Sequence, residues 1–191
     1  IYKKEINRFA FSGTTTGELP VLSPAQKNAV SQLHQAWKGH EVTLLHGVTS
    51  SGKTEIYIHL IDYVLKKGRQ VLYLVPEIAL TTQLTERLQK VFGEKVVIYH
   101  SKFSDNERVD IYRRILSSNE PVVIIGPRSA VFLPFATLGL VIIDEEHESS
   151  YKQQDPAPRY NGRDTAIMLA RMHGAKTLLG SATPAIDTYF K

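Results

Sequence analysis

The sequence of 191 residues contains no cysteine, which excludes a disulfide bond or a cysteine-liganded zinc site within this chain. It has no apolar run of the roughly 18 residues that a membrane-spanning helix needs, and it does not begin with a signal peptide. Charge of neither sign is in large excess: 23 basic and 19 acidic residues leave a net charge of +4, which permits a nucleic-acid partner without requiring one. The hydrophobic share of 42% fits one domain with a full core.

The most informative segment is GVTSSGKT, residues 47–54, which has the phosphate-loop pattern GxxxxGK[ST] between an apolar run and a helix-like stretch. In this pattern the glycines let backbone N–H groups surround a phosphate, Lys53 reaches the β- and γ-phosphate oxygens, and the Thr54 hydroxyl faces Mg²⁺. The segment predicts a nucleoside triphosphate site. Its nucleotide-binding residues are expected to be Gly47, Val48, Thr49, Ser50, Ser51, Gly52, Lys53, Thr54 and Glu55.

A second segment, DEEH at residues 144–147, directly follows an apolar run. Carboxylates at the C-terminal end of a parallel strand, beside a phosphate loop, are where an α/β nucleotide site places its metal partner and its base. We expect Asp144 to hold Mg²⁺ through water and Glu145 to orient and deprotonate the attacking water. Together with Lys53 they form the predicted catalytic set, which indicates hydrolysis rather than transfer to a nucleotide.

Six continuous apolar runs predict the strands of a sheet that is covered on both faces. They lie at residues 42–45, 71–75, 96–99, 122–125, 140–143 and 177–179. Between them apolar residues repeat at helical spacing, and Ser104 with Glu107 forms a capping box. The fold class is therefore α/β, a doubly wound and mostly parallel sheet with helices on both faces.

The chain begins with Ile1 and ends shortly after a motif, so we expect it to be a piece of a longer protein. Residues 1–20 contain the flexible segment SGTTTG and are expected to be a linker or the tail of a preceding domain. Residues 21–191 are expected to form one ATP-binding domain. The histidines lack the spacing of metal ligands.

The phosphate loop at residues 47–54 and the DEEH segment at residues 144–147 occur in the order that is found in the first motor lobe of superfamily 2 helicases. That lobe has a RecA-like phosphate-loop NTPase fold. The sequence resembles more closely the PriA-type replication-restart helicases, also called primosomal protein N′, over about residues 20–191. The shared stretches are VPEI at 75–78, HS at 100–101, RSAVF at 128–132 and DEEHESSYKQQ at 144–154.

The resemblance implies an ATP- and Mg²⁺-dependent 3′ to 5′ DNA helicase that acts on single-stranded and forked DNA in replication restart. It implies primosome proteins and single-strand-binding protein as partners, a bacterial cytoplasmic location at the nucleoid, and no membrane association. Zinc is expected only in a part of the parent protein that is not present here. The second motor lobe is also missing, so we expect this chain to be inactive alone.

The resemblance also assigns residues that contact DNA or couple it to hydrolysis. Gln26 would read the adenine, although Ser23 and Gln26 also fit a capping box, and the two roles are compatible. Arg128 would contact a DNA phosphate or be a solvated surface arginine. Pro127 stands where relatives often have Thr. The expected DNA and coupling residues are Pro76, Glu77, Arg128, Ser129, His147, Tyr151, Lys152, Arg159, Tyr160, Ser181 and Thr183.

Residues 149–164 are polar and contain two prolines, which predicts an ordered excursion rather than a helix. In the helicases that the sequence resembles, this is the aromatic-rich loop that couples DNA occupancy to hydrolysis. The chain has Ala157 and Pro158 where relatives carry a Trp, so Tyr151 and Tyr160 either stack on DNA or pack internally.

Two other functions stay open: a nucleotide- and DNA-binding module without activity, or a lobe of another superfamily 2 translocase. A zinc-binding insertion further along the parent protein would favour replication restart.

Overall fold

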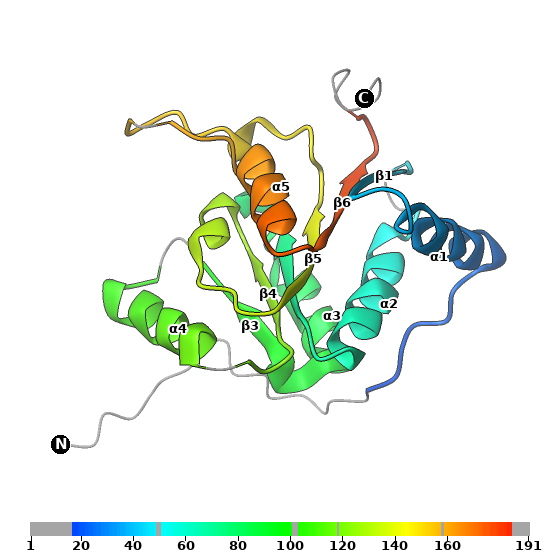
Figure 1. The fold of residues 1–191 in the computed structure, drawn as a ribbon, viewed down its shortest axis with the longest axis horizontal. Coiled ribbons are helices and arrows are strands. Elements are labelled where there is room, and N and C mark those ends of the chain that lie inside the picture. The colour runs from blue at the N-terminus through cyan, green and yellow to red at the C-terminus, as the bar shows by residue number, and fades with distance from the viewer. Residues whose placement is uncertain (1–16, 49–50, 101–102, 118, 158, 185–191) are drawn as a thin grey trace.

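The computed structural model describes residues 17–48, 51–100, 103–117, 119–157 and 159–184. Its centre is a six-stranded sheet in the order β1-β6-β5-β2-β4-β3, in which every pair is parallel. Figure 1 shows the helices packed around it. The strands are β1 (Val42–His46), β2 (Gln70–Leu74), β3 (Val96–Ile98), β4 (Val123–Gly126), β5 (Leu138–Ile143) and β6 (Lys176–Ser181). All six predicted strands and the predicted fold class are confirmed.

The described ranges contain five α-helices and four short 3₁₀ helices; α1 precedes β1, and the others lie between strands. The α-helices are α1 (Pro24–Ala36), α2 (Lys53–Lys66), α3 (Thr82–Phe92), α4 (Asp105–Ser117) and α5 (Gly162–Met172). The 3₁₀ helices are η1 (Glu77–Ala79), η2 (Gly93–Lys95), η3 (Arg128–Phe132) and η4 (Ser149–Tyr151). No helix in the described part of the chain is long and apolar enough to span a membrane.

The helices form two layers because successive strand residues point to opposite faces of the sheet. Val71 and Tyr73 of β2 belong to the core that packs α1, α2 and α3, whereas Leu72 and Leu74 belong to the core that packs α4 and α5. All of β2 and β5 is buried. This explains why the strands are continuously apolar in sequence.

Local sequence sets the helix boundaries. Ser23 and Gln26 form the predicted capping box of α1, with Pro24 at its first position. The predicted capping box of α4 also forms, because the Ser104 N–H donates to the Glu107 carboxylate at 2.8 Å and the Glu107 N–H donates to Ser104 Oγ at 3.4 Å.

Residues 149–157 and 159–161 form an ordered excursion, as predicted, but the helix after it begins earlier than expected. Residues 162–164 form the first turn of α5 instead of belonging to the loop. The physical reason is a helix cap: the Asn161 side chain accepts the Arg163 N–H at 3.0 Å, which satisfies a donor of the first turn.

The proposed linker, residues 1–20, is described only from residue 17 onward. In that part, Leu19 packs against the core, and His59 Nε2 of α2 lies 2.8 Å from the Pro20 carbonyl oxygen. Residues 19 and 20 therefore contact the lobe.

The strand order brings the motifs together at one edge of the sheet. Because β1, β6 and β5 are neighbours, the phosphate loop after β1, residues 180–183 at the end of β6 and the acidic segment after β5 share the C-terminal edge. The turns after β2 and β4, which contain η1 and η3, lie further along the same edge. The edge thus carries the predicted ATP residues at one side, and the predicted DNA residues of the turns after β2 and β4 further along.

Candidate functional site

The phosphate loop connects β1 to α2 as the sequence predicted, and its lysine lies within the loop. The Lys53 side chain is 9% exposed and donates to the Gly47 carbonyl at 2.9 Å and to the Val48 carbonyl at 3.5 Å. Thr49 and Ser50, both predicted nucleotide-binding residues, lie outside the described residues. The Lys53 ammonium is thus held over the loop that the pattern assigns to phosphate.

Gly52 is the residue at which the chain turns from the loop into α2. Its φ of 79° is in the left-handed region that favours glycine. A Cβ at this position would also collide with Nε2 of Gln26 and approach Glu55 Oε2 at 3.0 Å. The positive φ favours glycine, and a Cβ would also displace the ends of these two side chains, which gives the second fixed glycine of the pattern a structural cause.

Gln26 forms the predicted capping box, while its contact with adenine stays a prediction. Its Oε1 accepts the Ser23 N–H at 2.8 Å as part of the capping box, and its Nε2 donates to the Gly52 carbonyl at 3.1 Å. An amide oxygen accepts two hydrogen bonds and an amide nitrogen donates two. One acceptor site and one N–H therefore stay available for the bidentate adenine contact that we predicted.

Asp144 lies at the end of β5 and its carboxylate accepts three hydrogen bonds. Oδ1 accepts the Tyr57 hydroxyl at 3.0 Å and the Glu145 N–H at 3.1 Å, and Oδ2 accepts the Tyr73 hydroxyl at 3.2 Å. Burial raises the pKa of the Asp144 carboxyl above its ordinary value, while the hydrogen bond from Tyr57 acts in the opposite direction. Burial, together with the charge of Asp144, raises the pKa of both tyrosines well above the usual range, so both stay protonated donors.

Glu145 has the backbone strain that is common at functional sites. It is the only residue other than glycine with a positive φ in the described ranges, at 47°. Such a conformation costs on the order of 1–3 kcal/mol. Its carboxylate is one-third exposed, with Oε1 at 3.9 Å from Lys53 Nζ and Oε2 at 3.7 Å from His147 Nδ1. The strain turns this carboxylate toward the phosphate loop and the histidine.

His147 connects the acidic segment to the end of β6. Its Nδ1 lies 2.8 Å from Ser181 Oγ and its Nε2 lies 3.3 Å from Thr183 Oγ1. The Ser181 carbonyl in turn accepts the N–H of Gly47 at 3.1 Å. A continuous set of hydrogen bonds therefore joins DEEH, residues 181–183 and the phosphate loop.

The side chains of Thr54 and Asp144 supply hydroxyl and carboxylate oxygens, the ligand type that Mg²⁺ prefers. In the described ranges no group of three or more histidine, cysteine, aspartate and glutamate side chains could hold a metal ion. Mg²⁺ is usually bound through one or two carboxylates together with substrate phosphates and water. The residues present fit such a shared site, in which the nucleotide completes the coordination.

Arg128, predicted to contact DNA or solvent, is tied to the loop after β5. Its Nη1 donates to the Ser150 carbonyl at 2.7 Å. Burial raises the pKa of the Tyr160 hydroxyl, and the charge of Arg128 acts in the opposite direction. A Cβ at Gly162 would approach the Arg128 Cβ at 2.6 Å, so the start of α5 packs closely on this arginine. Ser129 lies beside it in η3, whereas Pro76 and Glu77 begin the turn after β2.

The aromatic-rich loop is a short hairpin with two different tyrosines. Lys152 pairs with Asn161 in an antiparallel bridge, and the Gln153 N–H donates to the Tyr160 carbonyl at 2.9 Å. Tyr151 is 2% exposed and donates its hydroxyl to the Asp144 carbonyl at 2.7 Å, so it packs internally. Tyr160 is half-buried and meets the exposed Phe132 ring edge-on, with centroids 5.0 Å apart.

Two cations of this loop are exposed. Lys152 and Arg159 are exposed, and Pro158 lies outside the described residues. These two cations have the exposure that a contact with a DNA backbone requires.

Several contacts of the site were not predicted from the sequence. Tyr57 and Tyr73 bind Asp144, and the buried Glu146 pairs with Arg163 at 3.0 Å. Glu55, predicted only as a nucleotide-binding residue, pairs with Arg87 of α3. The one sequence feature that could have indicated the tyrosines is their place: Tyr57 is one helical turn after Lys53, and Tyr73 interrupts an aliphatic strand.

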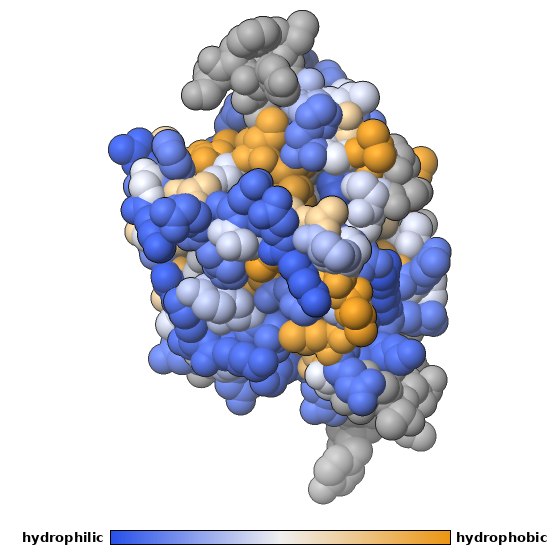
Figure 2. Space-filling view, turned by 90° about the vertical axis from the view of Figure 1, so that its right-hand side faces the viewer, coloured by the Kyte–Doolittle hydropathy of each residue, from blue (hydrophilic) through white to orange (hydrophobic). Residues whose placement is uncertain are grey.

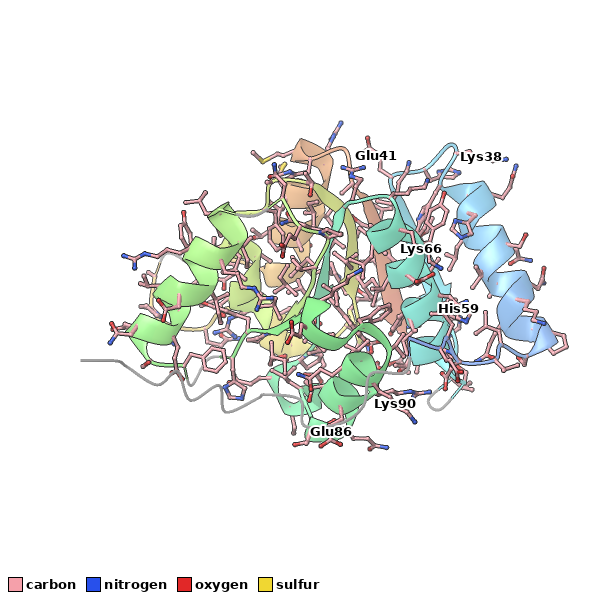
Figure 3. All side chains as sticks on the ribbon, turned by 90° about the horizontal axis from the view of Figure 1, so that it is seen from below. Lys38, Glu41, His59, Lys66, Glu86 and Lys90 are labelled. Atoms are coloured by element: carbon pink, nitrogen blue, oxygen red, sulfur yellow. The ribbon has the colours of Figure 1, made fainter. Side chains whose placement is uncertain are left out.

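A cavity of about 350 Å³ lies beside α1. Figure 2 shows the side of the molecule on which α1 lies in Figure 1. Figure 3 shows His59 on α2, at the side that faces α1 and the segment before it. The cavity is lined by Leu19, Pro20, Val21, Leu22, Lys27, Val30 and His59. Its lining includes Lys27, the residue that follows Gln26.

The chain is similar to curated proteins named replication restart protein PriA. It is 44% identical to that of Synechocystis sp. over 187 residues, covering 98% of this chain and 22% of the relative. It is 50% identical to that of Bacillus subtilis over 150 residues, covering 78% of this chain and 18% of the relative. The chain therefore spans about a fifth of the length of these relatives, and the predicted resemblance is confirmed.

Solved structures give the same architecture. RecG bound to a three-way DNA junction superposes with a TM-score of 0.64 at 27% identity, covering 90% of this chain and 22% of that one. The restriction-modification enzyme LlaGI in complex with a DNA substrate mimic shares the fold, with a TM-score of 0.60 at 15% identity, covering 87% of this chain and 18% of that one. The DEAD/DEAH box helicase family matches residues 23–190. With that match and this geometry, the chain belongs to the DEAD/DEAH box helicase family.

Proposed function

We propose that this chain is the first, ATP-binding motor lobe of a DNA-dependent ATPase and 3′ to 5′ DNA helicase that acts in replication restart. The observation that carries the proposal is the meeting of Lys53 and Glu145 at 3.9 Å, with Asp144 and His147 on either side of Glu145. At this distance the terminal phosphate of a bound nucleotide could lie close to both the cation and the base. The similarity to replication restart proteins supports the choice of process.

In this proposal each residue has one task. The loop amides and Lys53 hold the β- and γ-phosphates, and Gln26 reads the adenine edge. Glu145 accepts a proton from the attacking water. Thr54 and Asp144 hold Mg²⁺, which, when bound, neutralises charge on the phosphate oxygens.

His147 and Thr183 would sense the state of the nucleotide and transmit it toward the DNA side. They contact each other through Nε2 and Oγ1, and Ser181 connects both to the Gly47 N–H. A change at the phosphate loop therefore has a direct hydrogen-bonded path to the residues after β6. We assign the sensing role to these three side chains.

DNA would lie along the turns after β2 and β4, against Pro76, Glu77, Ser129 and the exposed Lys152 and Arg159. The hairpin that carries Arg159 returns to the catalytic segment at two points. Tyr151 donates to the Asp144 carbonyl, and Arg163 pairs with Glu146. Both points flank Glu145, so a displacement of the hairpin by DNA would reach the proposed base.

The remaining features belong to the parent protein. A second lobe would close on ATP and supply an arginine, which is worth about 10³–10⁵ in rate in related transfer reactions. Zinc, primosome proteins, single-strand-binding protein and a cytoplasmic location at the nucleoid follow from the same similarity. The alternative, a nucleotide- and DNA-binding module, describes this chain alone, because it lacks that second lobe.

Unwinding of DNA with a tail of defined polarity tests the proposal. The parent protein should unwind a fork with a 3′ tail in the presence of ATP, and its Lys53→Ala variant should not. ATP turnover that is stimulated by fully double-stranded DNA, without unwinding of either substrate, would favour another superfamily 2 translocase instead.

A further inference from the structure

Two buried tyrosines converge on the carboxylate that we assign to Mg²⁺, and each binds a different oxygen. Tyr57 donates to Oδ1 of Asp144 at 3.0 Å, and Tyr73 donates to Oδ2 at 3.2 Å. Both tyrosine side chains are 0% exposed. They come from different elements, α2 and β2, so the carboxylate is held from two directions.

This arrangement restricts a rotation that is otherwise soft. The terminal torsion of an aspartate is broad, so an unsupported carboxylate samples many orientations. One donor on each oxygen, together with the Glu145 N–H on Oδ1 at 3.1 Å, selects one orientation. A carboxylate has about four acceptor sites, and these three hydrogen bonds leave one of them, on Oδ2, to be presented in a fixed direction.

The positions of the two donors are themselves determined by packing. The rings of Tyr57 and Tyr73 meet edge-on, with centroids 5.5 Å apart and an interplanar angle of 73°. Gly180, at the end of β6, leaves the space for the Tyr57 hydroxyl, because a Cβ there would collide with that oxygen. Three elements thus fix where the hydroxyls point.

The same tyrosine lies on the helix that begins with the phosphate lysine. Tyr57 follows Lys53 by one turn of α2, so the two side chains share one side of that helix. The position of Asp144 is therefore fixed relative to the phosphate loop by the helix itself, and not only through the sheet.

We propose that Tyr57 and Tyr73 are positioning residues that orient Asp144 for Mg²⁺, so that this lobe binds the magnesium complex of the nucleotide more tightly than the free nucleotide. The proposal rests on the proposed function, because it assumes a Mg²⁺-nucleotide site at Asp144. Partners of this kind, which bond a metal ligand, typically contribute 10- to 100-fold to metal affinity or activity. Ordinary core tyrosines would contribute to stability alone.

The test separates magnesium-dependent binding from binding in general. Residues 1–191 are prepared as wild type, Tyr57→Phe, Tyr73→Phe and Tyr63→Phe, and the Kd of a fluorescent ADP analogue is measured with Mg²⁺ and with EDTA. Phenylalanine preserves the ring and removes only the hydroxyl. Tyr63 is a matched control because it lies on the same helix, is 40% exposed and bonds Lys67 instead of Asp144.

We expect Mg²⁺ to tighten binding in the wild type and in Tyr63→Phe. In Tyr57→Phe and Tyr73→Phe the Kd with Mg²⁺ should rise about tenfold, while the Kd in EDTA stays within twofold of the wild type. Thermal unfolding in EDTA identifies a merely structural effect, because a loss of stability would lower the Tm and raise the Kd both with Mg²⁺ and in EDTA.

Three results would overturn the proposal. Wild-type tightening by Mg²⁺ that both phenylalanine variants retain in full would show that the tyrosines are packing residues, and the proposed function would stand. An equal rise of Kd with Mg²⁺ and with EDTA would assign them to general stability. No binding of the analogue by the wild type under either condition would reject the proposed nucleotide site and this proposal with it.

Discussion

Arg163 and Glu146 form a buried ion pair, with Arg163 Nη1 3.0 Å from Glu146 Oε2. The Glu146 side chain is fully buried and that of Arg163 is 21% exposed. The pair joins the first turn of α5, directly after the aromatic-rich hairpin, to the residue that follows the proposed base. The Glu146 N–H also donates to the Gly180 carbonyl at 3.1 Å, so this residue connects α5, β6 and the acidic segment.

Removing the arginine should destabilise the lobe. Arg163→Ala leaves the Glu146 carboxylate buried without its main cation, and breaking a buried pair in this way costs about 3–5 kcal/mol. Asp164→Ala is the matched control. It removes a second partner of Arg163, the 61% exposed carboxylate of Asp164, and should cost less than about 1 kcal/mol. Urea unfolding of residues 1–191 measures the free energy of unfolding of both variants. Equal small losses would contradict the structural role of the pair.

The second prediction concerns Asp144 and pH. Burial raises the pKa of this carboxyl above its ordinary value of 3.8, so the folded state binds its proton more tightly than the unfolded state. Its contribution to stability is therefore fully present below pH 3.8 and is lost as the pH rises through the folded pKa. Asp144→Asn removes this loss, and a gain of 1 kcal/mol would raise the Tm by about 2–4 °C.

The measurement is the Tm of wild type and Asp144→Asn in EDTA from pH 4 to pH 7. The Tm of Asp144→Asn should be close to that of the wild type at pH 4 and should exceed it increasingly toward pH 7. A difference that is independent of pH, or that favours the wild type at pH 7, would contradict the assigned direction.

The third prediction concerns the hairpin in the parent protein. Arg159→Ala and Tyr160→Ala should leave nucleotide affinity nearly unchanged and reduce the stimulation of ATP turnover by single-stranded DNA about fivefold or more, since a coupling residue contributes to the difference between two states. The ATPase rate is measured against DNA concentration at fixed salt, because backbone binding depends on salt. Gln154→Ala, exposed in the same hairpin, is the control. Full maximal stimulation in both variants would leave the hairpin a structural element.

Much of this architecture could be predicted because it depends on patterns along the chain. Continuous apolar runs identify strands that are covered on both faces, and parallel strands place their following segments at one edge. That is why residues 47–54 and 144–147 were expected together before the strand order was known. The fixed glycine at position 52 also follows from the phosphate-loop pattern alone.

The contacts that could not be predicted depend on which elements are neighbours and on how side chains are oriented. Tyr57 and Tyr73 bind Asp144 only because β2 lies beside β5 and α2 covers both. Tyr151 and Tyr160 have the same residue type in one loop, yet the first is buried below the carboxylates and the second is half-exposed at Phe132. The resemblance assigned both to the loop, and the sequence left their orientation open.

The fourth prediction concerns the chain by itself. Residues 1–191 should bind Mg²⁺-nucleotide weakly and turn it over much more slowly than about 1 per second, because the second lobe of the composite site is absent. Calorimetry with ADP and a phosphate-release assay measure the two quantities. Turnover near 1 per second would mean that one lobe contains the complete site.

If Lys53 binds phosphate and Glu145 activates water, substitutions at these two residues should have different effects in the parent protein. ATP affinity and single-turnover hydrolysis are measured for wild type, Lys53→Ala and Glu145→Gln. We expect Lys53→Ala to lose both, whereas Glu145→Gln should keep ATP affinity and lose at least about 10²-fold in hydrolysis. Hydrolysis by Glu145→Gln at the wild-type rate would show that Glu145 does not activate water.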